Sequence, residues 1–101
     1  MDQPGSSPLV MVVESDGARR EVAEALLASS HFAVAPVESV DGALAVCRTL
    51  APEVIVCHEA DEGRMRAGLL PLVIPIVATD AAPETIEAIV ERVRTAIRGR
   101  V

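Results

Sequence analysis

Short apolar runs alternate with amphipathic segments along most of the chain. Val54–Val56 are three consecutive β-branched residues that follow Pro52 and precede a charged segment, a pattern typical of a strand buried on both faces. Leu9–Val13 is another uninterrupted apolar run of this kind. Such runs suit the interior of a parallel sheet, because helices cover both faces of a sheet of that type.

Three segments show the periodicity of amphipathic helices, at residues 18–29, 40–50 and 86–97. Ser39 is expected to cap the second of these helices, since its hydroxyl can accept a hydrogen bond from an unpaired backbone N–H. Pro83 fits the first turn of the last helix. The apolar positions of the three stripes are Val22, Ala25 and Leu26 with the flanking Ala23 and Leu27, then Val40, Ala43, Leu44, Cys47 and Leu50, then Ile86, Ile89, Val90, Val93 and Ile97.

Two further strands are predicted, both at edges of the sheet. The run at residues 32–37 contains Pro36, which cannot donate to a strand ladder. Leu69–Val77 is apolar apart from two prolines and is interpreted as the fourth strand, with Thr79 near its polar end. The segment 59–68 has room for little more than two helical turns, and its two glycines weaken even those.

This order predicts an α/β, flavodoxin-like three-layer sandwich with a short, mostly parallel four-stranded sheet, shortened between the third strand and the last helix. The 101 residues suffice for one domain. Residues 1–8, rich in glycine, serine and proline, are expected to form a flexible lead-in to a single domain at 9–101. Half of the residues are apolar but Phe32 is the only aromatic one, so the core must be aliphatic.

Charge and cysteine content narrow the classes of function. The formal charge is −6 and all nine basic residues are arginine, so a nucleic-acid partner is not expected. Cys47 and Cys57 lie within apolar elements and are interpreted as buried free thiols in a reducing compartment. The first eight residues do not resemble a signal peptide, and no apolar run is long enough to cross a membrane, so a cytoplasmic location is expected.

Polar side chains follow the predicted strands at their carboxyl ends. In an open parallel sheet these ends border the functional crevice. The residues placed there are Glu14, Ser15, Asp16, His58 and Thr79.

Two sequence frames carry a family resemblance. Val12-Val13-Glu14-Ser15-Asp16, and Pro52-Glu53 followed by the apolar strand that ends in His58, resemble the receiver domain of two-component response regulators. The resemblance covers residues 8–98 and implies a CheY-like fold, a phosphoacceptor aspartate, an acidic pair that binds magnesium, and a lysine.

Departures from that pattern indicate a degenerate, shortened pseudo-receiver. His58 stands where the family has its phosphoacceptor aspartate, and the acidic pair is replaced by Glu14 and Ser15, with Asp16 one position later. The chain contains no lysine, and Thr79 aligns either with the Thr that ends the fourth strand or with the missing lysine. No catalytic set, metal site or cofactor is therefore predicted.

The sequence leaves more than one interpretation open for His58 and for the acidic residues Glu14 and Asp16. His58 can be a hydrogen-bonded structural residue, a phosphohistidine site or a pH switch. Glu14 and Asp16 can compensate the charge at a helix N-terminus or retain some metal binding.

The predicted function is a phosphorylation-independent interaction or dimerisation module of a bacterial signalling protein, with a protein partner or a second copy and without enzymatic activity. A shortened sheet is expected to expose apolar side chains, and the interface is predicted at Met65, Leu69, Leu70 and Leu72. One alternative is an atypical receiver that still responds to phosphate or metal. Another is a small flavodoxin-like enzyme or nucleotide binder, although no phosphate-binding glycine loop or nucleophile elbow is present.

Overall fold

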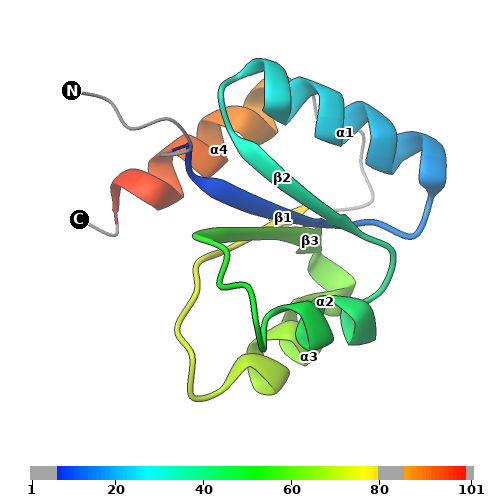
Figure 1. Cartoon of the computed structure of the whole chain (residues 1–101), viewed down its shortest axis with the longest axis vertical. Coiled ribbons are helices and arrows are strands. Elements are labelled where there is room, and N and C mark those ends of the chain that lie inside the picture. The colour runs from blue at the N-terminus through cyan, green and yellow to red at the C-terminus, as the bar shows by residue number, and fades with distance from the viewer. Residues whose placement is uncertain (1–6, 80–85, 100–101) are drawn as a thin grey trace.

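Four parallel strands form one sheet in the order β2-β1-β3-β4, with two helices on each face (Figure 1). The computed structural model describes residues 7–79 and 86–99. This architecture confirms the predicted flavodoxin-like sandwich. The elements are β1 (Leu9–Val13), α1 (Gly17–Ser29), β2 (Ala33–Val37), α2 (Val40–Val46), β3 (Val54–His58), α3 (Glu59–Leu69), β4 (Ile76–Thr79) and α4 (Ile86–Arg98).

The two central strands are buried on both faces, which explains their continuous apolar sequences. Val10 and Val12 of β1 face α1 and α4, where they share a core cluster with Leu27 and Val93. Met11, the residue between them, belongs to the opposite cluster. Successive side chains of a strand point to opposite faces, so one apolar run supplies both cores.

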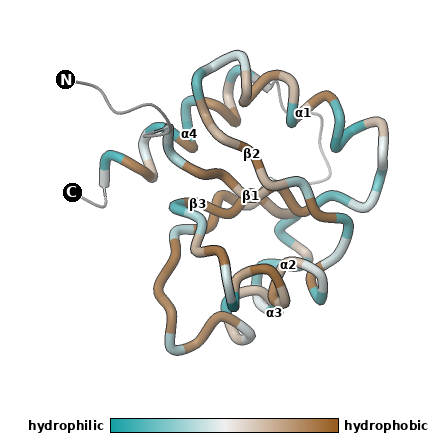
Figure 2. The backbone as a smooth tube through the Cα atoms, viewed as in Figure 1, coloured by the Kyte–Doolittle hydropathy of each residue, from teal (hydrophilic) through white to brown (hydrophobic). Residues whose placement is uncertain are grey.

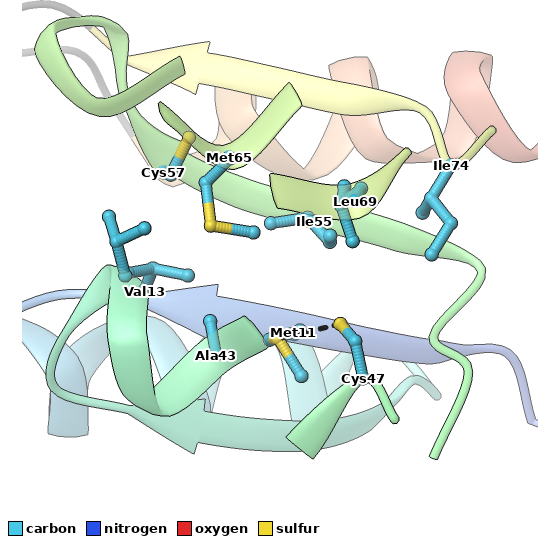
Figure 3. Close-up of a cluster of buried hydrophobic side chains, with 10 residues drawn as sticks. Met11, Val13, Ala43, Cys47, Ile55, Cys57, Met65, Leu69 and Ile74 are labelled. Atoms are coloured by element: carbon cyan, nitrogen blue, oxygen red, sulfur yellow. Dashed lines mark hydrogen bonds between the residues drawn. The ribbon is translucent and has the colours of Figure 1, made fainter. Parts of the chain in front are cut away.

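The second core lies between the sheet and the pair α2 and α3 (Figure 3). Met65 of α3 has no exposed surface and lies above Ile55 of β3 in this cluster. Cys47, at the end of α2, has its sulfur 3.9 Å from that of Met11. Cys47 and Cys57 are both buried and free, as predicted.

The segment after β3 differs from the prediction, because residues 59–69 form a helix of 11 residues instead of a short turn. Its first turn carries Glu59, Asp61 and Glu62, which suit the positive end of a helix dipole. Glu62 also forms an ion pair with Arg66 one turn later. The charged segment that follows β3 therefore begins α3.

The fourth strand starts at Ile76, seven residues later than the predicted start at Leu69. Leu69 instead ends α3, and an apolar connection at residues 70–75 leads to β4 (Figure 2). Its two prolines remove ladder donors, and the Leu72 amide donates to the Leu69 carbonyl in a turn. The expected exposure of apolar side chains is wrong for Ile74 and Val77, which are buried, whereas Leu72 and Val73 are exposed in the connection.

Details of the helices also depart from the periodicity. On α1, the core-facing residues are Leu27 and Ala23, the flanking members of the predicted stripe, whereas Val22 is half exposed. Helix α2 ends at Val46, and Leu50 is exposed beyond it. Pro83 lies outside the described residues. Within the described ranges, no helix has the length and apolar character needed to span a membrane.

Candidate functional site at the carboxyl ends of the strands

Glu14 and His58 meet at the carboxyl edge of the sheet. Glu14 follows β1 and His58 ends the neighbouring strand β3. The Nε2 atom of His58 lies 2.9 Å from Oε1 of Glu14. The side chain of Glu14 is 13% exposed and that of His58 33%, so the contact is partly shielded from water. The site therefore contains a histidine–carboxylate pair.

Glu14 is fixed by several further hydrogen bonds. Its Oε2 accepts from the backbone N–H of Asp16 at 3.0 Å. Its own amide donates to the Val37 carbonyl at 3.0 Å, and its carbonyl accepts from a guanidinium nitrogen of Arg20 at 2.8 Å. Because backbone and side chain are both held, the carboxylate is pre-positioned toward His58.

Asp16 serves as the N-cap of α1. Its Oδ1 accepts from the backbone N–H of Arg19 at 3.0 Å, which satisfies a donor that has no partner inside the helix. This hydrogen bond is the main reason that the pKa of the Asp16 carboxyl lies below its ordinary value. The capping role matches the structural interpretation of this residue. Ser15, between the two acids, is exposed.

Thr79 is brought beside His58 by the β3–β4 ladder, in which the two residues are opposite each other. Its hydroxyl donates to the carbonyl of Cys57 at 3.4 Å. Three of the predicted site residues, Glu14, His58 and Thr79, therefore gather at adjacent strand ends. Ser15 and Asp16 remain on the turn that leads into α1, so a Ser-His-Asp arrangement is not formed.

The side chains that the structure describes at this edge do not fit a magnesium ion. Hard cations need several clustered oxygen ligands. The acceptor position holds an imidazole, one Glu14 oxygen contacts it, and the Asp16 carboxylate caps a helix. Among the described residues, no group of three or more His, Cys, Asp and Glu side chains is placed to hold a metal ion.

The predicted interface residues divide into two sets. Met65 and Leu69 lie in the core between the sheet and α3, so they cannot form an exposed surface. The reason is that the helix they belong to was not expected. Leu70 and Leu72 lie in the connection before β4 and are exposed, as is Val73.

Sequence reasoning missed two arginines that touch backbone at this end of the sheet. Arg20 binds the Glu14 carbonyl, and Arg92 of α4 donates to the Ala78 carbonyl of β4 at 2.6 Å. Both belong to helices that cover the same face of the sheet. Contacts of this kind leave no periodic signal in the sequence, since the backbone partners lie outside the helix that carries the arginine.

Comparison with known proteins supports the fold. No protein-family model and no curated protein sequence matches the chain. Among solved structures, a response regulator from Thermotoga maritima is similar with a TM-score of 0.68 and 17% identity, over 91% of this chain and 98% of that one. A second structure, described as a novel family of redox sensors in the streptococci evolved from two-component response regulators, has a TM-score of 0.67 and 15% identity. The match covers 93% of this chain and 52% of the streptococcal one. The chain thus has the CheY-like fold of receiver domains.

Proposed function

We propose that this domain is a pseudo-receiver: a non-catalytic protein-interaction module of a signalling protein that acts without phosphorylation. The observation that supports the proposal is the contact between His58 and Glu14. In the family that the sequence resembles, the corresponding strand end carries the aspartate that accepts phosphate. Here the same position holds an imidazole already engaged by a carboxylate.

The chemistry of the site argues against phosphate uptake. An imidazole cannot form the acyl phosphate of that family. Glu14 is beside the ring, and the acidic first turn of α3 follows His58 directly, so an incoming phosphoryl group meets negative charge. The chain has no lysine to offset that charge.

A role in association is consistent with what the domain exposes. Leu70 is 71% exposed and Val73 is 87% exposed, and both belong to the connection to β4. Apolar side chains grouped on a surface are typical of contact sites. One structurally similar protein is described as a redox sensor evolved from response regulators, which supports the idea that the receiver fold can be adapted to other roles.

The test is incubation with a small phosphodonor and magnesium, followed by intact-mass measurement at neutral pH, where phosphohistidine survives. We expect no added phosphoryl group and no magnesium-dependent shift of the His58 or Glu14 NMR signals. A label that disappears in His58→Gln would show that the histidine is a phosphoacceptor. A magnesium-dependent shift that disappears in Glu14→Ala would instead favour an atypical responsive receiver.

A further inference from the structure

The two outer edges of the sheet differ in what they offer a partner. In β2, Ala33 donates to the Pro8 carbonyl, and the Val37 carbonyl accepts from Glu14, so both residues direct their backbone groups toward β1. Because successive residues of a strand point these groups to opposite sides, Val34 and Pro36 face outward. Proline has no N–H, so this edge is poorly suited to pairing.

The edge formed by β4 lacks such protection. The Pro75 carbonyl accepts from the Ile55 amide, so Pro75 and Val77 face β3, whereas Ile76 and Ala78 face outward. The strand Ile76–Thr79 contains no proline, glycine or charged residue, and its β-branched residues favour extended structure. In the part of the chain that the structure describes, no strand pairs with this edge.

One side chain lies across the open edge. Arg92 is exposed on α4, and its guanidinium donates to the outward carbonyl of Ala78. This contact comes from a long, hydrated side chain, which can be displaced by a backbone donor at modest cost. The Arg92 side chain therefore covers part of the β4 edge but does not prevent another strand from pairing with it.

A shallow pocket of about 410 Å³ runs beside the edge, between β4 and α4. Its lining residues are Ile76, Val77, Glu91, Arg92, Thr95 and Ala96. The lining carries one carboxylate and one guanidinium, and Glu91 also forms an ion pair with Arg94, so the pocket has no strong excess of either charge. A two-fold axis can place the acid of one copy near the base of the other, which is the self-complementarity that a symmetric dimer requires.

We propose that two copies of this chain associate by pairing their β4 strands antiparallel across this edge, which would join the two sheets into one. The inference rests on the proposed interaction function, and it identifies the interaction partner as a second copy of the chain. A two-fold axis through Val77 places Ile76 of one copy opposite Ala78 of the other, so that every outward residue finds a partner. Arg92 releases the Ala78 carbonyl in this arrangement.

The connection before β4 extends the surface. A short strand pair buries less than the roughly 1,200 Å² of a stable interface, so additional apolar contact is needed. Leu72 and Val73 are exposed in the segment that leads into β4, and in the proposed dimer they would contribute to it. The net charge of −6 on each copy opposes association, and salt screens that repulsion. The dimer therefore strengthens as ionic strength rises.

Sedimentation and amide exchange of the whole chain test the proposal. The decisive variant is Ala78→Pro, which removes an outward N–H and leaves the β3–β4 hydrogen bonds in place. The matched control is Val34→Pro, the same change at an outward position of the opposite edge. We expect a dimer that is weakened about tenfold or more by Ala78→Pro and unchanged by Val34→Pro. The Ile76 and Ala78 amides should exchange more slowly as protein concentration rises, while the Val34 amide should not.

Far-UV circular dichroism establishes that the variants fold, and Ala78→Lys is the second variant if proline does not allow folding. A lysine there keeps the backbone donor but places like charges near the two-fold axis. A wild-type monomer at high micromolar concentration in high salt would overturn the proposal, as would a dimer unaffected by both Ala78 substitutions. If the protein is a monomer and takes up no phosphoryl group, the proposed function stands and only this interface is refuted. If the protein is a dimer and becomes phosphorylated, the interface stands and the phosphorylation-independent function is refuted.

Discussion

Gly68 of α3 lies against Leu44 of α2 with no room for a side chain between them. A Cβ atom placed on Gly68 would be 2.5 Å from Cδ1 of Leu44 and 2.9 Å from its Cδ2. Those distances are shorter than normal van der Waals contacts, so the two helices pack at this separation because residue 68 has no side chain. The glycine that weakens α3 as an isolated helix is what allows α3 to pack beside α2.

Gly68→Ala should therefore destabilise the domain although alanine is the better helix former. We expect a loss of about 1–3 kcal/mol in the free energy of unfolding, because Leu44, which packs partly buried against the core, must shift and loses contacts there. The control is Gly63→Ala on the same helix, where nothing lies within 4 Å of the added atom and the gain is about 0.5–1 kcal/mol. Urea unfolding of the two variants measures both, and equal effects would contradict the packing argument.

The cap of α1 gives a prediction in the acid range. The folded-state pKa of Asp16 is lowered, so the ionised cap contributes stability above the unfolded pKa of 3.8, and that contribution is lost as pH falls through the lower folded value. Asp16→Ala should lower the thermal midpoint at pH 7 and flatten its pH dependence below pH 4. Ser15→Ala, at an exposed neighbouring position, should change neither. Thermal unfolding between pH 2 and 7 would show whether the two variants differ.

The order of elements could be predicted because sequence and burial agree along most of the chain. The run Leu9–Val13 corresponds to β1, Ser39 caps α2 by accepting from the Gly42 amide, and Pro36 lies on an edge strand. In each case a local property, such as a hydrophobic run, a capping hydroxyl or a missing N–H, favours the same local structure that the fold requires at that position.

Helix α3 could not be predicted because tertiary packing overrides its weak local preference. Gly63 and Gly68 lower the propensity, but burial of Met65 and Leu69 compensates. That single error moved the predicted start of β4 and placed two core residues at an interface. The candidate site was located by its strand ends, yet the contact between His58 and Glu14 depends on rotamers that periodicity does not reveal.

The pair formed by His58 and Glu14 should show measurable coupling. A double-mutant cycle with His58→Ala and Glu14→Ala is expected to give about 0.5–1 kcal/mol at neutral pH, since the contact is only partly shielded. The matched control is the ion pair of Arg64 and Asp41, whose side chains are much more exposed and should couple near zero. Chemical unfolding of the two cycles makes the comparison. Coupling no larger than that of the control would mean that the histidine contact does not organise the site.

The buried thiol of Cys57 should limit stability at alkaline pH. Burial is the main cause that raises the pKa of Cys57 from 9.0 to about 11, and the nearby carboxylates of Asp61 and Glu62 add to it. A raised folded pKa means that the contribution to stability is fully present below pH 9 and is lost as pH rises toward about 11. Cys57→Val, which cannot ionise, should reduce the fall in unfolding free energy over this range.

The same burial predicts slow chemistry at both thiols. The thiolate is the reactive form, so Cys47 and Cys57 should react with a thiol reagent at pH 8 only at the rate at which the domain opens. Denaturant should release both thiols to rapid reaction, which provides the internal control. Rapid labelling of Cys57 in the folded protein would contradict its burial and would instead favour a thiol-based sensing role. The packing interpretation predicts slow labelling of Cys57, and it predicts that Cys57→Val remains stable above pH 9. Both results together would show that the Cys57 side chain contributes through its volume in the core and not through the reactivity of its sulfur.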